Sequence, residues 1–213
     1  MTRVGLLGGS FNPAHRGHRR ISRFAAQALD LDEIWWLVSP GNPLKEAAGM
    51  APLGPRFRSA LRAARGLPIR VSAIERELGT TYTVETIQAL RRRYPHTRFV
   101  WLMGADNLVQ FHRWRDWRRI AALVPIAVIG RPGYDGRAHA ARAMGWLRRY
   151  VRPAGQARHW TKWRLPALVL LRSPPDPTSA TALRAADPCW YNAPHLAFTM
   201  KALRDGVTRR PLE

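Results

Sequence analysis

The hydrophobic and polar positions alternate along the chain between short apolar runs and longer segments with helical periodicity. Six apolar runs bounded by polar or turn residues predict β-strands at Val4–Gly8, Ile34–Ser39, Ile69–Ser72, Phe99–Met103, Ile126–Gly130 and Leu168–Leu171. Helical patterns follow most of these runs and predict helices at Gly17–Leu29, Pro55–Arg65, Thr83–Tyr94, Trp117–Leu123, Arg137–Tyr150, Ala180–Ala186 and His195–Arg204. Strands that alternate with helices form a parallel sheet with helices packed on its faces, so the sequence predicts an α/β fold.

The length and composition favour one globular domain. The 213 residues suffice for one α/β domain with a substantial core, and we find no internal repeat or low-complexity linker. We therefore expect a single domain over residues 1–213, with a core over 1–175 and a helical segment with a loose tail over 176–213. No apolar run reaches the roughly 18 residues of a membrane-spanning helix, and the N-terminus lacks the longer apolar core of a signal peptide. The single cysteine, Cys189, excludes an internal disulfide, so we expect a cytoplasmic protein.

The charge of the chain admits two interpretations. The formal net charge is +21, which suits binding to polyanions but equally suits a surface of solvated arginines. Residues 136–175 contain no Asp or Glu and interleave arginines with Trp146, Trp160 and Trp163. This segment could bind single-stranded nucleic acid, or it could be amphipathic, with its tryptophans packed inward. We favour the second interpretation because a helix of an α/β fold needs an apolar face.

A glycine turn and two histidines follow the first predicted strand. Gly8 and Gly9 end that strand and lead into the first predicted helix. Glycines let a ligand approach the backbone closely, and a helix N-terminus presents unpaired N–H groups. His15 and His18, with Gly17 between them, can point toward one ligand and donate hydrogen bonds to phosphate oxygens. The alternative is a pair of surface or metal-binding histidines, but no third metal ligand is evident nearby.

Two segments resemble motifs of one superfamily. Gly8–His18, GGSFNPAHRGH, resembles the GGTFDPxHxGH signature of the adenylyltransferases and cytidylyltransferases; Ser10 and Asn12 depart from it but keep small polar side chains. Thr178–Arg184, TSATALR, resembles the ISSTxxR motif of the same superfamily, which holds the β- and γ-phosphates of the nucleotide. The resemblance implies a Rossmann-like open parallel sheet, flanked by helices on both faces, with a short C-terminal helical segment. Read without the resemblance, the second segment is better explained as a helix cap before an arginine, and the resemblance reverses this preference.

The middle of the chain narrows the family. It resembles the bacterial nicotinate-nucleotide adenylyltransferases at Val38–Lys45, Glu75, Thr81–Thr86, Gly104–Asn107, Trp114 and Gly130–Tyr134. The loop before Lys45 is one residue shorter than the family's usual Asn-Pro-Pro-His-Lys and lacks its histidine. The resemblance implies an enzyme that moves AMP from ATP to nicotinate mononucleotide, giving deamido-NAD and pyrophosphate. It also implies that Mg²⁺ is held by the nucleotide phosphates and not by protein ligands.

The motifs and the resemblance together predict the site residues. We expect catalytic roles for His15, His18 and Arg184. We expect ATP to contact Gly8, Gly9, Ser10, Phe11, His15, His18, Gly104, Asp106, Ser179, Thr181 and Arg184. We expect nicotinate mononucleotide to contact Asn42, Lys45, Tyr82, Thr83 and Trp114. The chemistry agrees, since the turn at Tyr82 can present backbone N–H groups to an anion and Trp114 can stack on a cationic pyridinium.

Two alternative functions remain open from the sequence. The first is a sister adenylyltransferase that uses nicotinamide mononucleotide or another phosphate acceptor. The second, of another class, is a basic nucleic-acid-binding protein that uses residues 136–175. In such a protein the two phosphate motifs would have no function. Under the favoured interpretation the partners are small molecules, and we expect neither a membrane nor a nucleic acid among them.

Overall fold

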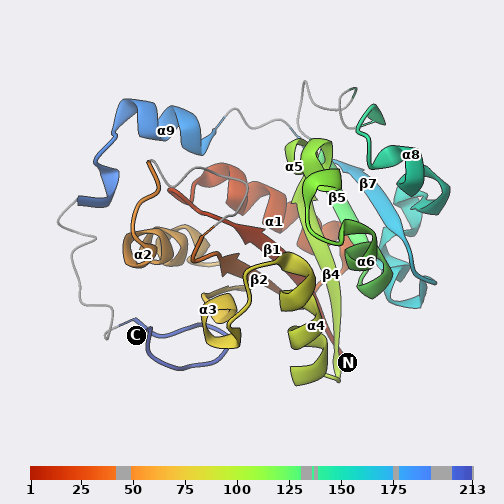
Figure 1. Ribbon diagram of the computed structural model, residues 1–213, viewed down its shortest axis with the longest axis horizontal. Coiled ribbons are helices and arrows are strands. Elements are labelled where there is room, and N and C mark those ends of the chain that lie inside the picture. The colour runs from red at the N-terminus through yellow and green to blue at the C-terminus, as the bar shows by residue number, and fades with distance from the viewer. Residues whose placement is uncertain (42–48, 131–135, 137–138, 175–177, 193–202, 213) are drawn as a thin grey trace.

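The computed structural model describes residues 1–41, 49–130, 136, 139–174, 178–192 and 203–212 (Figure 1). The described strands are β1 (Thr2–Gly9), β2 (Glu33–Val38), β3 (Ile69–Ser72), β4 (Thr97–Gly104), β5 (Ile126–Gly130), β6 (Val151–Arg152) and β7 (Leu168–Arg172). They form one sheet in the order β3-β2-β1-β4-β5-β7-β6, and every neighbouring pair is parallel. The order reverses between β1 and β4, so the sheet is doubly wound and Rossmann-like, and its switch point is where such sheets bind ligands.

Helices cover both faces of this sheet. The described helices are α1 (Arg16–Leu29), α2 (Leu53–Ala64), α3 (Ile74–Leu78), α4 (Thr83–Arg93), α5 (Ala105–Gln110), α6 (Trp117–Leu123), α8 (Met144–Leu147) and α9 (Ala180–Ala186), with 3₁₀ turns η1 (Phe111–Arg113), η2 (Arg148–Tyr150), η3 (Ala154–Lys162) and η4 (Trp190–Asn192). One core packs α3, α4, α5, α6 and α8 on the sheet, and a second core packs α1, α2 and η3 on the opposite face. Figure 1 shows α4 and α6 in front of the sheet and α9 at the upper left. None of the described helices is both long and apolar enough to cross a bilayer.

The strand sequences explain the two cores. Neighbouring strand residues point to opposite faces, so Leu6 and Trp35 enter the first core while Leu7 and Trp36 enter the second. Because both faces are covered, the strands read as continuous apolar runs and not as alternating patterns. All six predicted strands are confirmed, and the short edge strand β6 is an addition.

The helix predictions are confirmed in the core and wrong toward the C-terminus. The helices predicted at Trp117–Leu123 and Ala180–Ala186 have the predicted bounds, and those predicted at Gly17–Leu29, Pro55–Arg65 and Thr83–Tyr94 differ by one or two residues at one or both ends. The single helix predicted over Arg137–Tyr150 is wrong: residues 140–143 form a turn, and only α8 and η2 follow it. The helix predicted over His195–Arg204 lies mostly outside the described residues. Its last position, Arg204, is not helical and forms an isolated bridge with Pro211.

The C-terminal residues 203–212 fold back onto the outer edge of the sheet, so the prediction of a loose tail is wrong for them. The Gly206 N–H donates to the Val71 carbonyl at 2.8 Å, in the edge strand β3. The carboxylate of Asp205, only 5% exposed, accepts from the Ser72 hydroxyl and the Ala73 N–H. This segment thereby covers part of a strand edge that would otherwise expose unpaired backbone groups.

The tryptophans of residues 136–175 pack inward. Trp160 is 1% exposed, and its indole N–H donates to the Leu29 carbonyl at the end of α1, at 2.9 Å. Trp146 packs edge-on against Trp117 on the first core, and Trp163 packs on the second. The amphipathic interpretation of this segment therefore agrees with its structure, although short helices and strands replace the single long helix.

Candidate active site

A cavity of about 520 Å³ lies at the carboxyl ends of β1 and β4, the switch point of the sheet. Every predicted site residue in the described part lines it: Gly8, Gly9, Ser10, Phe11, His15, His18, Tyr82, Thr83, Gly104, Asp106, Trp114, Ser179, Thr181 and Arg184. Asn42 and Lys45 lie outside the described residues. The structure thus gathers segments from the first, middle and last parts of the chain around one space.

The loop between β1 and α1 is held in an uncommon backbone conformation. Phe11 has a positive φ of 46°, and its buried ring stacks on Trp36 with the ring centroids 5.0 Å apart. The Asn12 side chain turns away toward the chain that precedes α2: its amide donates to the Gly49 carbonyl at 2.8 Å, and its carbonyl accepts from the Ala51 N–H at 3.3 Å. An ionised aspartate could not donate to the Gly49 carbonyl. This hydrogen bond explains why asparagine is suited to position 12, where the superfamily signature has Asp.

The two histidines form a linked pair at the N-terminus of α1. His15 is the N-cap, and its Nδ1 accepts from the Gly17 N–H at 3.0 Å. The His15 N–H donates in turn to Nδ1 of His18 at 3.2 Å, and the two ring centroids lie 4.0 Å apart. Because both Nδ1 atoms accept hydrogen bonds, each neutral imidazole carries its proton on Nε2. The arrangement therefore provides two Nε2–H donors next to the cavity.

Glycines keep the space around these rings open. A Cβ on Gly17 would lie 2.8 Å from Cε1 of His15 and 3.2 Å from the Thr178 carbonyl oxygen. A Cβ on Gly8 would lie 2.7 Å from the Trp101 ring, and one on Gly104 would collide with the Asp106 carboxylate. Glycine is thus needed at these positions for close approach, even though none of the three has a positive φ.

The second phosphate motif is joined to the first by hydrogen bonds. The Ser179 hydroxyl accepts from the Ala182 N–H at 3.1 Å and so caps α9. Arg184 donates from Nη1 to the Asn12 carbonyl at 2.6 Å and from Nη2 to the Thr181 hydroxyl at 3.4 Å. Two motifs about 170 positions apart in the chain therefore form one wall of the cavity.

A buried arginine, which sequence reasoning missed, supports this wall from behind. Arg56 on α2 is 1% exposed, and its guanidinium donates to four carbonyls, those of Ser10, Ser39, Pro40 and Ala51. Burial lowers the pKa of Arg56 to about 10, so the group stays charged at neutral pH. Nothing in the sequence distinguishes Arg56 from the many surface arginines, since its role depends on four distant carbonyls.

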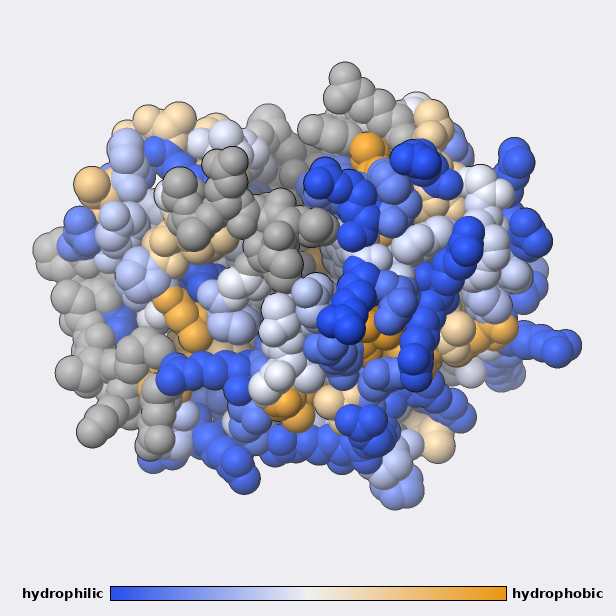
Figure 2. All heavy atoms as spheres, viewed as in Figure 1, coloured by the Kyte–Doolittle hydropathy of each residue, from blue (hydrophilic) through white to orange (hydrophobic). Residues whose placement is uncertain are grey.

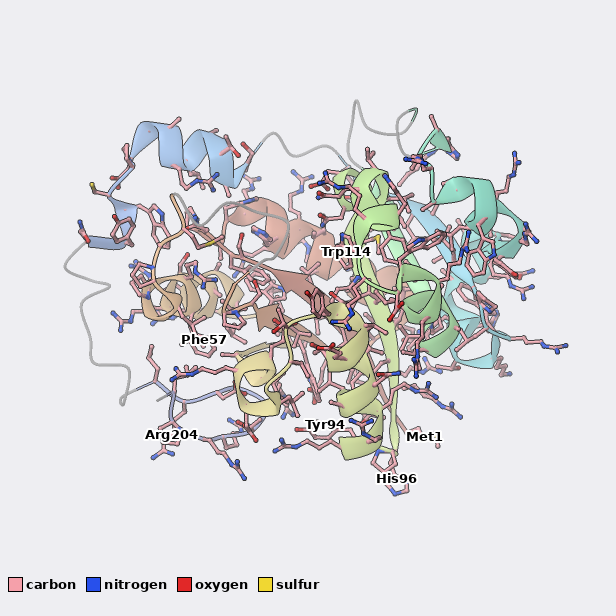
Figure 3. All side chains as sticks on the ribbon, viewed as in Figure 1. Met1, Phe57, Tyr94, His96, Trp114 and Arg204 are labelled. Carbon is pink, nitrogen blue, oxygen red and sulfur yellow. The ribbon has the colours of Figure 1, made fainter. Side chains whose placement is uncertain are left out.

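The opposite wall is aromatic and carries the N-terminus of α4. Tyr82 is the N-cap of that helix, and Thr83 is its first residue. The Arg115 guanidinium lies 4.5 Å above the Tyr82 ring and 3.5 Å from the Glu85 carboxylate. Trp114 lies beside α5 in Figure 3 and meets Trp101 edge-on, with the ring centroids 6.1 Å apart. This wall offers a flat aromatic surface together with backbone N–H groups and a cation.

Glu75 is the other buried charge of the site that sequence reasoning did not place there. It lies on α3, is 8% exposed and lines the cavity. Burial raises the pKa of Glu75 to about 7, and the hydrogen bond from Thr86 opposes the rise. The remaining lining residues that were not assigned to the site beforehand include Asn12, Ser39, Trp101, Asn107, Gln110, Arg113 and Arg115. Proximity to Trp114 could have indicated the last two of these.

Among the described residues, no group of three or more His, Cys, Asp or Glu side chains could hold a metal ion. The cavity is instead lined by acidic and basic side chains, Asp106 and Glu75 beside Arg113, Arg115 and Arg184, together with the hydrogen-bonding imidazoles of His15 and His18. This distribution suits ligands that carry several negative charges.

Comparison with known proteins identifies the family. Residues 6–186, which include both phosphate motifs, match the family model described as cytidylyltransferase-like. The chain belongs to the cytidylyltransferase-like family. Within it, a relative from Erythrobacter litoralis named "Probable nicotinate-nucleotide adenylyltransferase" is 64% identical over 99% of this chain and 94% of its own length. A relative of the same name from a Bradyrhizobium species is 49% identical over 88% of this chain and 98% of its own.

A solved structure shows a similar fold. The Plasmodium falciparum nicotinic acid mononucleotide adenylyltransferase complexed with NaAD superposes with a TM-score of 0.65 at 14% identity, covering 87% of this chain and 83% of that one. At this identity the likeness supports the Rossmann-like α/β fold. The cytidylyltransferase-like family assignment itself rests on the sequence match.

Proposed function

We propose that the protein transfers AMP from ATP to nicotinate mononucleotide, giving deamido-NAD and pyrophosphate. The observation that carries the proposal is the single cavity that joins two phosphate motifs on one wall to an aromatic, N–H-bearing wall opposite. The relatives named for this activity, one of them 64% identical, support the choice of acceptor. Residues 1–213 would act as a single domain, since α9 and the core build the cavity together. The lone Cys189 is free, which suits action in a reducing cytoplasm.

On the ATP side, the reaction is an in-line displacement. A phosphate oxygen of the mononucleotide attacks the α-phosphorus of ATP, and the bond to the departing pyrophosphate breaks, without a covalent enzyme intermediate. The Nε2–H groups of His15 and His18 would stabilise the charge that builds up on the α-phosphate. Arg184 would face the β- and γ-phosphates, while Arg56 adds a fixed positive charge behind the loop. Catalysis then consists of positioning and charge neutralisation.

The remaining ATP contacts follow from the loops. Gly8, Gly9, Ser10 and Phe11 would let the nucleotide approach the backbone, with Ser179 and Thr181 near its terminal phosphates. Gly104 and Asp106 would face its ribose. ATP would enter with a divalent cation, which we expect to be Mg²⁺, coordinated by the phosphates as part of the substrate.

On the acceptor side, the N-terminus of α4 and Trp114 would hold the pyridine ring. The backbone N–H groups around Thr83 would bind the carboxylate at the positive end of the helix dipole. Trp114 would stack on the cationic ring, for which tryptophan is the most favourable aromatic partner. Asn42 and Lys45, which follow β2 in the chain, would reach the phosphates of the mononucleotide.

An assay of pyrophosphate release tests the proposal. Purified protein with ATP and a divalent cation should release pyrophosphate when nicotinate mononucleotide is added, and more slowly with nicotinamide mononucleotide. His18→Ala should lower kcat about 10²–10³-fold while the circular dichroism spectrum stays unchanged. His96→Ala is the matched control, because that histidine is exposed near the far end of α4 (Figure 3). Release that is equally slow with both acceptors, or near-normal turnover by His18→Ala, would contradict the proposal.

A further inference from the structure

Glu75 places a carboxyl group in the wall where the acceptor's pyridine ring is proposed to bind. It lines the same cavity as Thr81, Tyr82, Thr83 and Trp114, yet its side chain is almost wholly buried. Within the described part of the chain, no cation pairs with its carboxylate, whose one hydrogen-bond partner is the hydroxyl of Thr86. A buried carboxylate with so little compensation favours its protonated form.

The contact with Thr86 connects Glu75 to the first turn of α4. Oγ1 of Thr86 lies 3.3 Å from Oε1 of Glu75, 3.3 Å from the Tyr82 carbonyl oxygen and 2.9 Å from the Thr80 hydroxyl. A hydroxyl has one proton to donate, so Thr86 can satisfy only one acceptor at a time. An ionised Glu75 accepts the hydrogen bond from the Thr86 hydroxyl. A protonated Glu75 donates a hydrogen bond to that hydroxyl instead, so Thr86 can donate to the Tyr82 carbonyl. The protonation state of Glu75 therefore changes the hydrogen bonding at the N-terminus of α4, which would bind the acceptor.

The charged groups nearby are engaged with other partners. On α3, Glu77 pairs with Arg93 and Arg210; on α4, Glu85 pairs with Arg115. Asp205 of the C-terminal segment, which packs at the start of α3, accepts bonds from Ser72 and Ala73. The other charged or titratable groups of the cavity are His15, His18, Tyr82, Asp106, Arg113 and Arg184, and those of α3 and α4 are Arg76, Arg91 and Arg92.

We propose that Glu75 determines acceptor specificity through its proton: the neutral carboxyl favours the acid nicotinate mononucleotide, and the carboxylate favours the amide. This inference rests on the proposed function. Because its side chain is buried in the cavity wall, an ionised Glu75 would repel the acceptor's carboxylate, whereas it could accept a hydrogen bond from a carboxamide N–H.

The direction of the pH dependence follows from burial. With the pKa of Glu75 raised to about 7, the group is protonated below neutral pH and ionised above it. Binding of the acid should then take up a proton above pH 7, which weakens it, while binding of the amide should release a proton below pH 7. The preference for the acid should therefore be greatest below pH 7 and should decline as the pH rises. Titrations that both acceptors share, those of their phosphate and of the histidines, cancel in the ratio of the two.

The test is the ratio of kcat/KM for nicotinate over nicotinamide mononucleotide between pH 6 and pH 8.5. In the wild-type protein the ratio should fall at least about tenfold between pH 6 and pH 8, because loss of the neutral form of a group with a pKa of about 7 lowers the rate with the acid by that factor on its own. Glu75→Gln should hold the ratio near its low-pH value at every pH. Glu77→Gln is the matched control on the same helix, outside the cavity, and should retain the fall.

Three outcomes would overturn the inference: a flat ratio in the wild-type protein, a persisting fall in Glu75→Gln, or a flat ratio in Glu77→Gln. If Glu75→Gln does not fold, calorimetry of the wild-type protein in buffers of different ionisation enthalpy decides. At pH 7.5, binding of the acid should take up a substantial fraction of a proton and binding of the amide should take up none; equal uptake would contradict the inference. Absence of turnover with either acceptor would refute the proposed function instead, so the two failures are distinguishable.

Discussion

Gly17 is the residue on which the geometry of the histidine pair depends most directly. Its missing side chain leaves the 2.8 Å and 3.2 Å approaches to His15 and the Thr178 carbonyl open. Gly17→Ala should displace the His15 ring and lower kcat about 10–100-fold, because a shift of about 1 Å in a positioned group can cost that much. The backbone there is already helical, so Ala should leave the melting temperature within a few degrees of that of the wild type.

Gly145→Ala provides the control for this change. Gly145 lies in α8, where an added Cβ meets nothing within 4 Å, so its kcat should stay at the wild-type value. Normal kcat in Gly17→Ala, measured by pyrophosphate release, would show that His15 tolerates the crowding and is not positioned as proposed.

At this scale the sequence predicts residues whose roles are local. His15, Gly17 and His18 are adjacent in the chain, so their spacing alone indicates a shared ligand. Arg56 and Glu75 acquire their roles from burial and from partners on other segments, which no spacing encodes. Tertiary contacts therefore account for what sequence reasoning missed at the site.

At the scale of elements, Arg56 connects three parts of the site. Its guanidinium bonds the carbonyls of Ser10 after β1, Ser39 after β2 and Ala51 before α2. Arg56→Met keeps much of the side-chain volume but leaves these acceptors buried without their donor. The free energy of unfolding should fall by about 2–4 kcal/mol, and KM for ATP should rise.

Urea denaturation and initial-rate kinetics check both effects of Arg56→Met. Arg62→Met is the matched control, because Arg62 is an exposed arginine of the same helix and its removal should cost less than about 0.5 kcal/mol. Equal stability of the two variants would contradict the inference that the hydrogen bonds of Arg56 hold these three segments together.

Elements were predictable where burial is continuous and unpredictable where they are short. The strands are covered on both faces, so their apolar runs are unambiguous, and amphipathic α1 and α4 show clear periodicity. α3 has five residues and no side-chain cap, which is too little pattern to detect. The segment predicted as Arg137–Tyr150 has the right composition, but it breaks into turns, and Gly145 lies within the four-residue α8 that remains.

At the scale of the whole molecule, the C-terminal segment stabilises the sheet edge that leads to the acceptor side. Asp205 accepts from Ser72, Ala73, Val207 and Thr208, and it anchors residues 203–212 to β3 and the start of α3. Asp205→Ala would leave these four donors without their acceptor, and those of Ser72 and Ala73 are buried. The free energy of unfolding should fall by about 2–4 kcal/mol, and trypsin should cleave the C-terminal segment sooner.

The exposed Asp187 provides the comparison for this variant. Asp187→Ala should change the unfolding free energy by less than about 0.5 kcal/mol and leave the cleavage rate unchanged. A stable Asp205→Ala with an intact segment would mean that the fold-back contributes little to stability.

The net charge of +21 gives the whole molecule a positive field, and both proposed substrates are anions. Figure 2 shows hydrophilic residues gathered over the right and lower parts of one face, and in the described part of the chain the large hydrophobic side chains left exposed are Met1, Val151 and Leu183. If this charge steers substrates, kcat/KM for ATP should fall about 3–10-fold as NaCl rises from 50 to 500 mM, while kcat changes less than about twofold. Stopped-flow association rates should show the same dependence, because screening acts on encounter and not on the bound state.

The nucleic-acid alternative predicts a different result: a labelled single strand would bind at 150 mM salt, and His18→Ala would not weaken that binding. If kcat/KM does not change with salt and a single strand binds tightly, the arginines would serve nucleic-acid recognition and not substrate capture.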